Sequence, residues 1–159
     1  AISACEKGGQ WEKALELFNS MPVNGVKPNE ITTSALIEVL EGFGHSSQAD
    51  GVMLRAREND LFHMVWPSES KIDLRGCSVA VARTVLRRTF FDLKSGALPC
   101  YNITVVTGQG KKSGEKGPVL PEQVRSYVAE YSGLQITEVP TNPGRFLLLR
   151  RDLLLWVEE

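Results

Sequence analysis

Residues 71–117 read KIDLRGCSVAVARTVLRRTFFDLKSGALPCYNITVVTGQGKKSGEKG, and the order of secondary structure in the second half of the chain follows from this stretch. Two short apolar runs rich in β-branched residues, 71–74 and 103–106, flank a longer segment with helical periodicity. Ser78 suits the N-cap of that helix. Its inward face is predicted to carry Ala82, Val85, Leu86, Phe90 and Leu93. The pattern predicts a strand, an amphipathic helix and a second strand.

The remainder of the second half adds two helices and two strands. Pro121 suits a first helical turn and Gly133 a helix end, and the prolines and glycine between 140 and 144 indicate a turn. We expect these elements near residues 121–131, 135–139, 145–150 and 152–159. The last should be a short helix that packs Leu155 or Trp156 on the core. This order predicts an α/β fold at residues 71–159, a two-layer sandwich with a four-stranded mixed sheet and two main helices.

The first half contains an internal repeat. A shift of 35 residues superposes residues 1–21 on residues 36–56, and three residues meet identical partners in the pairs Glu6/Glu41, Gly9/Gly44 and Ala14/Ala49. A period in the mid-thirties with two short helical patterns per unit is typical of stacked helical hairpins. We therefore predict about one and a half helical repeats at residues 1–58 and a linker at residues 59–70, where the periodicity lapses.

The run GGQWEKALELFNSMPVNGVKPNEITTSALI at residues 8–37 resembles the pentatricopeptide repeat (PPR). In that family, helix pairs stack into a solenoid and successive repeats each read one RNA base. The resemblance implies single-stranded RNA as the partner, and it assigns base reading to Ser34 in the second unit and to Asn29 after Lys-Pro. The alternative is that these repeats cap a solenoid and contact no base.

The charge is unevenly distributed along the chain. Residues 1–70 carry five basic and ten acidic side chains, whereas residues 71–151 carry thirteen basic and six acidic ones, within a total net charge of −1. A basic domain beside an acidic one suggests a polyanion partner for the second half. A solvated lysine-rich face is the alternative explanation.

Two features of the second half suit a polyanion. The run TGQGKKS at residues 107–113 offers glycines that let backbone amides approach an oxyanion, and lysines to neutralise it. The spacing matches neither a nucleoside triphosphate loop nor a dinucleotide fingerprint. The preceding helix carries a basic stripe that includes Lys94. The predicted nucleic-acid-binding residues are Thr107, Gly108, Gly110, Lys111, Lys112, Arg83 and Arg87. A solvated turn and an ordinary exposed helix face are the alternatives.

The runs KIDLRGCSVAVAR and ITVVTGQGKKS resemble the small MutS-related (Smr) domain, and this resemblance covers about residues 70–150. Smr domains are nucleic-acid endonucleases or binding modules, and in plants and algae they follow PPR repeats. Thr107-Gly108-Gln109-Gly110 agrees with one family motif at every fixed position. The other motif, Leu-Asp-x-His, departs from the family, because Arg75 stands where histidine is expected.

The departure at Arg75 affects the expected activity. Histidine exchanges protons near neutral pH, whereas a guanidinium stays charged and can only stabilise negative charge. The resemblance makes Asp73 and Arg75 the catalytic candidates, and we expect binding to survive better than cleavage. Three functions are therefore considered for the chain. It is an RNA-binding protein of the PPR and Smr type, an endonuclease that cleaves RNA or nicks DNA, or a protein-interaction module.

Cofactors and membranes are not expected. The three cysteines and two histidines lack ligand spacing, which predicts no zinc site, although a divalent metal at a nuclease site stays open. No stretch approaches the roughly 20 apolar residues of a membrane span. By family resemblance we expect a monomer that binds single-stranded RNA, with DNA as an alternative, in a plastid or mitochondrion.

Overall fold

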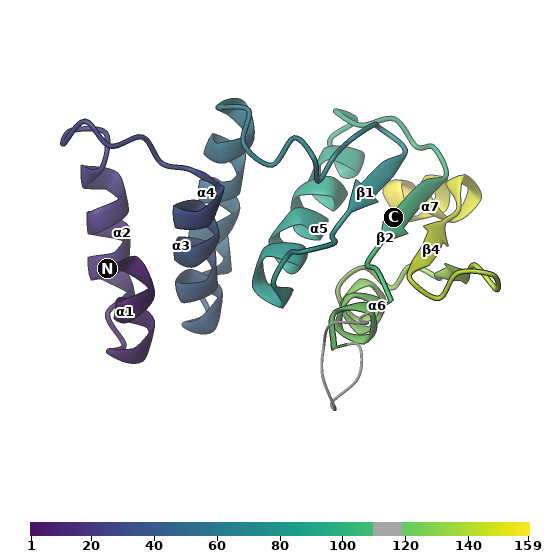
Figure 1. Ribbon diagram of the computed structural model, residues 1–159. Coiled ribbons are helices and arrows are strands. Elements are labelled where there is room, and N and C mark those ends of the chain that lie inside the picture. The colour runs from purple at the N-terminus through teal and green to yellow at the C-terminus, as the bar shows by residue number, and fades with distance from the viewer. Residues whose placement is uncertain (110–118) are drawn as a thin grey trace. The chain divides into compact units, whose positions relative to one another are not determined.

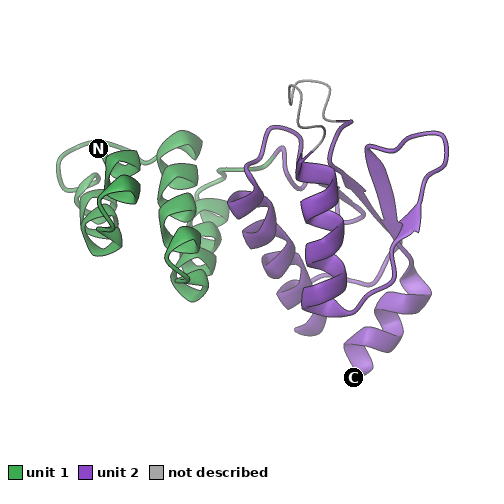
Figure 2. Cartoon of the chain, turned by 90° about the horizontal axis from the view of Figure 1, so that it is seen from below, with its two compact units in different colours: residues 1–63 green, residues 64–159 purple. Residues whose placement is uncertain are grey.

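The computed structural model describes residues 1–109 and 119–159 (Figure 1). These residues divide into two compact units, Ala1–His63 and Met64–Glu159 (Figure 2). The described part of the chain contains seven helices, and the second unit holds a four-stranded sheet. An α/β fold with an N-terminal helical repeat is therefore confirmed.

The first unit consists of helical hairpins, as the internal repeat predicts. Gly9 and Gly44, which the 35-residue shift superposes, both have left-handed φ angles, +65° and +77°. Each lies in the turn within a hairpin, where the missing Cβ allows this conformation. The helices of this unit are α1 (Ile2–Lys7), α2 (Trp11–Ser20), α3 (Glu30–Gly42) and α4 (Ser46–Glu58).

The sheet of the second unit has the strand order β1-β2-β4-β3 and is mixed. β1 (Lys71–Asp73) pairs in parallel with β2 (Ile103–Val106). β4 (Arg145–Leu148) pairs in antiparallel fashion with β2 and with β3 (Thr137–Glu138). The parallel pair needs a crossover connection, and α5 (Val79–Lys94) supplies it. The predicted four-stranded mixed sheet is confirmed.

One face of the sheet is buried and the other is partly exposed. Ile72, Val105 and Phe146 lie in register across three strands, and each is at most 2% exposed. α5 and α6 (Val119–Ser132) lie side by side on one side of the sheet (Figure 2). The alternate positions on β1, β2 and β4 are half-buried at Lys71, Thr104 and Leu147. The second unit is thus a two-layer arrangement.

The long helix α5 forms as the sequence predicts. The side chain of Ser78 caps it by accepting a hydrogen bond from the backbone N–H of Val81 at 3.3 Å. All five predicted inward residues are at most 2% exposed, namely Ala82, Val85, Leu86, Phe90 and Leu93. The apolar periodicity therefore identified the core face of this helix.

The last helix, α7 (Arg150–Glu158), forms close to the predicted range, and Trp156 is the expected residue that packs on the core. Of the two residues expected on the core, Leu155 or Trp156, Leu155 is 65% exposed, and Leu153 is the fully buried residue of this helix. The ring of Trp156 packs edge-on against Phe90, with centroids 5.5 Å apart. Leu153 and Trp156 are three residues apart and share a helix face, and Leu155 lies on another face.

Residues 59–63 of the predicted linker pack within the first unit and residues 64–70 belong to the second. Phe62 is buried, and its backbone N–H donates to the Glu30 carboxylate at 2.8 Å within the first unit. Val65 is buried in the second unit, where the indole N–H of Trp66 donates to the Thr89 hydroxyl at 3.0 Å. The boundary between the units falls inside this segment, and the aromatic residues around it anchor the chain on either side.

Candidate functional site

The candidate site lies where the parallel strands β1 and β2 end. Asp73, the last residue of β1, is in register with Val106, the last residue of β2. The backbone N–H of Leu74 donates to the Val106 carbonyl at 2.8 Å. Arg75 and Thr107 therefore lie just beyond the ends of two neighbouring strands. The carboxyl ends of parallel strands meet at one edge of a sheet. The two motifs singled out in the sequence therefore come together here.

Asp73 and Arg75 form a bidentate ion pair. The Nε of Arg75 donates to Oδ1 of Asp73 at 2.9 Å, and its Nη2 donates to Oδ2 at 2.5 Å. The backbone N–H of Arg75 also donates to Oδ1, at 3.2 Å. The Asp73 side chain is 14% exposed and the Arg75 side chain 62%. The carboxylate is thus held in place while part of the guanidinium faces solvent.

This ion pair stabilises the charged form of both groups. Hydrogen bonds from the Arg75 side chain lower the pKa of Asp73 below its ordinary value. The same bonds raise the pKa of Arg75. A carboxylate with a lowered pKa is a weaker base, and the guanidinium keeps its proton. The pair is better suited to stabilising negative charge than to transferring protons.

The turn after β2 brings Gly108 against Arg75. Gly108 has a φ angle of +76°, and a Cβ at this position would lie 3.4 Å from the Cγ of Arg75. Thr107 is buried, and its hydroxyl donates to the carbonyl of Gly144 at 3.3 Å. Thr107 and Gly108 therefore belong to the same edge as the ion pair. The other residues predicted for this turn lie outside the described residues: Gly110, Lys111 and Lys112.

Gly144 is a site residue that the sequence analysis missed. Its carbonyl accepts the backbone N–H groups of Thr107 at 2.9 Å and of Gly108 at 3.2 Å. These two amides are therefore satisfied within the protein, whereas the glycine-rich pattern led us to expect amides available to an oxyanion. In the sequence, Pro143 and Gly144 indicated only a turn. That pattern does not show that Gly144 contacts the residues after β2.

The basic stripe expected on α5 faces a neighbouring helix. Arg87 is 8% exposed, and its Nη1 donates to the hydroxyl of Tyr127 on α6 at 3.3 Å. Arg83 donates to the side-chain oxygen of Gln123 at 3.2 Å and lies over the Tyr127 ring, 5.4 Å from its centroid. The expectation of a solvent-facing stripe is wrong at Arg87, because α6 covers this side of α5.

The two expected base-reading residues lie at the start of α3. Asn29 is the N-cap, and its Oδ1 accepts the backbone N–H of Thr32 at 2.9 Å. The Thr32 hydroxyl accepts the backbone N–H of Asn29 at 3.0 Å, which completes a capping box. Ser34 is half-buried on α3. Asn29 thus has a structural role as the cap of α3.

No metal or membrane feature is found in the described part of the chain. Its His, Cys, Asp and Glu side chains form no group of three or more that could hold a metal ion. No helix within residues 1–109 and 119–159 is long and apolar enough to cross a membrane.

Comparison with known families supports the resemblance of the first unit. Residues 1–41 match the PPR repeat family, and the match covers α1, α2 and all but the last residue of α3. No curated protein matches the chain. The second unit lies outside the matched residues.

Proposed function

We propose that this chain is an RNA-binding protein. The main support for this proposal is that residues 1–41 match the PPR repeat family and that the first unit is built from helical hairpins. PPR repeats read single-stranded RNA one base per repeat. In this proposal Ser34 and Asn29 at the start of α3 are the base-reading residues.

The second unit, in our proposal, acts like an Smr domain and contacts the sugar-phosphate backbone. Asp73 engages the Nε and Nη2 of Arg75 and orients the guanidinium, whose exposed edge can donate to a phosphate oxygen. Lys111 and Lys112 add positive charge next to Thr107 and Gly108 in the sequence. Backbone contacts of this kind position a strand without reading its bases.

Binding is favoured over cleavage at this edge. Arg75 replaces the histidine of the Smr motif, and the pKa of Asp73 is lowered by the hydrogen bonds from Arg75. Neither group is therefore poised as a general base near neutral pH. The combined resemblance to PPR and Smr proteins favours a role in the RNA metabolism of a plastid or mitochondrion.

RNA binding by the 159-residue chain tests the proposal. Fluorescence anisotropy with a labelled single-stranded RNA should give an affinity that falls steeply with salt, because phosphate contacts release counterions. Arg75→Ala should weaken binding several-fold. Arg151→Ala is the matched control, since its side chain is 78% exposed on α7 and it removes the same charge. A double-stranded DNA competitor distinguishes RNA from DNA as the partner.

Three outcomes would count against parts of the proposal. Absence of binding at low salt would rule out RNA binding by this chain. Equal losses in Arg75→Ala and Arg151→Ala would indicate a general charge effect without a site at the sheet edge. Full affinity in Arg75→Ala and in Lys111→Ala/Lys112→Ala would confine RNA contact to the first unit and favour protein interaction for the second.

A further inference from the structure

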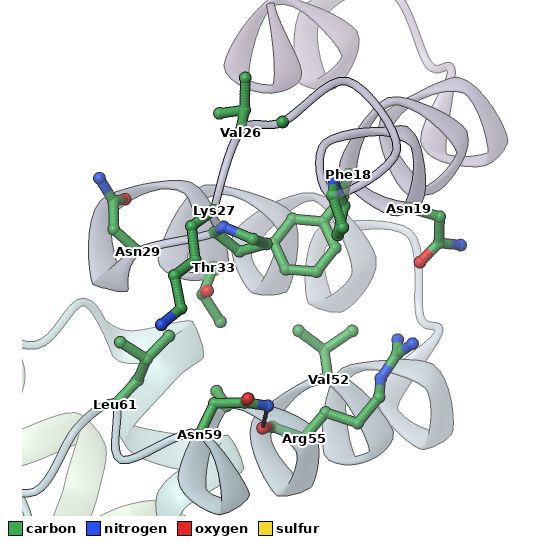
Figure 3. A pocket seen from close by; sticks show the side chains of 14 residues that line it. Phe18, Asn19, Val26, Lys27, Asn29, Thr33, Val52, Arg55, Asn59 and Leu61 are labelled. Atoms are coloured by element: carbon green, nitrogen blue, oxygen red, sulfur yellow. Dashed lines mark hydrogen bonds between the residues drawn. The ribbon is translucent and has the colours of Figure 1, made fainter.

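The first unit contains a pocket of about 840 Å³ that the sequence analysis did not anticipate. It lies between α2, α4 and the connection from α2 to α3, as Figure 3 shows. Its walls are mainly apolar, with Phe18 on α2, Val52 and Ala56 on α4, and Val26 and Leu61 from the flanking segments. This volume falls within the range of sites for small organic molecules.

The Thr33 hydroxyl is buried in this pocket without a hydrogen-bond partner among the described residues. Thr33 is 0% exposed, and its Oγ1 is unpaired. Its side chain points from α3 into the pocket (Figure 3). A buried hydroxyl without a partner costs free energy, and a ligand or a water molecule that bonds it removes this cost.

The local structure explains why Thr33 is unpaired. Thr84 and Thr89 on α5 donate their hydroxyls to the carbonyls four residues earlier, at 2.9 and 3.0 Å. The corresponding carbonyl for Thr33 is that of Asn29. It already accepts the backbone N–H of Thr33 at 3.0 Å and the hydroxyl of Thr32 at 3.1 Å. Two donors therefore already share this acceptor at the cap of α3, and the Thr33 hydroxyl makes no bond to it.

The charges around the pocket are of one sign. Lys27 and Arg55 are both exposed and line it, and none of its lining residues is acidic. Figure 3 shows them at different sides of the opening, with Lys27 on the chain segment before α3 and Arg55 on α4. Residues 1–63 as a whole hold five basic and nine acidic side chains. The pocket thus concentrates positive charge within a unit of net negative charge, which favours an anion.

We propose that this pocket binds a small organic anion with an apolar body. The apolar body would pack on Phe18 and Val52, and Lys27 or Arg55 would pair with its anionic group. The Thr33 hydroxyl, which is closed off from solvent here, would turn to bond a polar atom of the ligand. This inference does not rest on RNA binding, because neither Ser34 nor the sheet edge takes part in it, although Asn29, the other proposed base-reading residue, also lines the pocket.

A matched set of small probes tests the pocket on the 159-residue chain. The probes are 2-naphthoate, the neutral 2-naphthamide with the same rings, and acetate, which has the charge without the rings. Titrations followed by ligand-observed NMR should show saturable binding of 2-naphthoate. The amide should bind at least about tenfold more weakly, because it lacks the negative charge that Lys27 or Arg55 would pair with. Acetate should show no saturable binding, because it has no apolar body to bury.

Three variants locate the binding. Thr33→Val keeps the shape and removes the hydroxyl, so affinity for 2-naphthoate should fall by about three- to tenfold while the melting temperature does not fall. Arg55→Ala should reduce affinity by a similar factor or more. Lys7→Ala, an exposed basic residue outside the pocket lining, is the control and should leave affinity unchanged. Equal affinity for acid and amide, or unchanged affinity in both Thr33→Val and Arg55→Ala, would overturn the proposal.

Discussion

The backbones of Gly144 and Gly108 are in direct contact. A Cβ added to Gly144 would lie 2.7 Å from the carbonyl carbon of Gly108 and 2.9 Å from its carbonyl oxygen. The Gly144 carbonyl in turn accepts two backbone N–H groups from the turn after β2, those of Thr107 and Gly108. The connection between β3 and β4 therefore fixes the position of the turn that lies beside Arg75.

Replacement of Gly144 by alanine should destabilise the second unit. The added methyl group meets backbone atoms that cannot move aside like a flexible side chain, and overpacking of this kind costs about 1–3 kcal/mol. Urea denaturation followed by circular dichroism measures the loss. Gly51→Ala on α4 is the comparison, since a Cβ there meets nothing within 4 Å. It should stabilise its helix by about 0.5–1 kcal/mol. Unchanged stability in Gly144→Ala would contradict the contact.

The Asp73–Arg75 pair predicts a pH-dependent contribution to stability. The pKa of Asp73 in the folded protein lies below 3.8, its ordinary value, because Arg75 donates hydrogen bonds to it. Its contribution is therefore fully present above pH 3.8 and is lost as the pH falls through the folded pKa. Asp73→Asn should cost about 0.5–1 kcal/mol near neutral pH, a modest value because the pair is partly exposed.

Urea denaturation at a series of pH values measures the difference in unfolding free energy between wild type and Asp73→Asn. The difference should narrow as the pH falls below 3.8. The pKa of Glu138 is also lowered, by its hydrogen bonds with Arg125, but that pair is present in both proteins and cancels in the comparison. A difference that stays constant with pH would mean that the carboxylate charge contributes nothing.

Local sequence patterns predicted the helices and strands but not which helix packs against which. The apolar periodicity of α5 identified its buried core face, because that face is set by residues within one helix. The partner on its other side is α6, which contacts Arg83 and Arg87 through Gln123 and Tyr127. A helical wheel shows that Arg83 and Arg87 share a side, but it carries no information on where a later helix packs. Arg87 was for this reason expected in solvent.

The pocket of the first unit escaped prediction for a different reason. Thr33 occupies a position with ordinary helical spacing, and its burial follows from that spacing. The missing hydrogen bond depends on two donors that already occupy the Asn29 carbonyl. Such competition for one acceptor is a property of the folded geometry. The capping signal of Asn29 was present in the sequence, but we assigned that residue to base reading alone.

The two roles of Asn29 can be separated by substitution. Asn29→Ala removes the N-cap acceptor and should destabilise the first unit by about 1 kcal/mol. Asn29→Asp keeps an oxygen that can accept from the Thr32 backbone N–H, so the free energy of unfolding should change by no more than a few tenths of a kcal/mol. If Asn29 reads a base, Asn29→Asp should nevertheless alter base preference in a selection from randomised RNA. Unchanged preference in Asn29→Asp and in Ser34→Asn would make α3 a cap of the solenoid.

The last prediction separates a binder from a nuclease at the sheet edge. Arg75→His restores the residue of the Smr motif and supplies a group that exchanges protons near neutral pH. General acid–base catalysis contributes typically about 10²- to 10⁴-fold to rate, so single-turnover cleavage of end-labelled RNA should rise while affinity changes little. Asp73→Asn in the Arg75→His background should abolish the gain, because Asp73 lies at hydrogen-bonding distance from residue 75. Wild-type cleavage as fast as that of Arg75→His would show that the arginine belongs to a working active site and that the preference for binding is wrong.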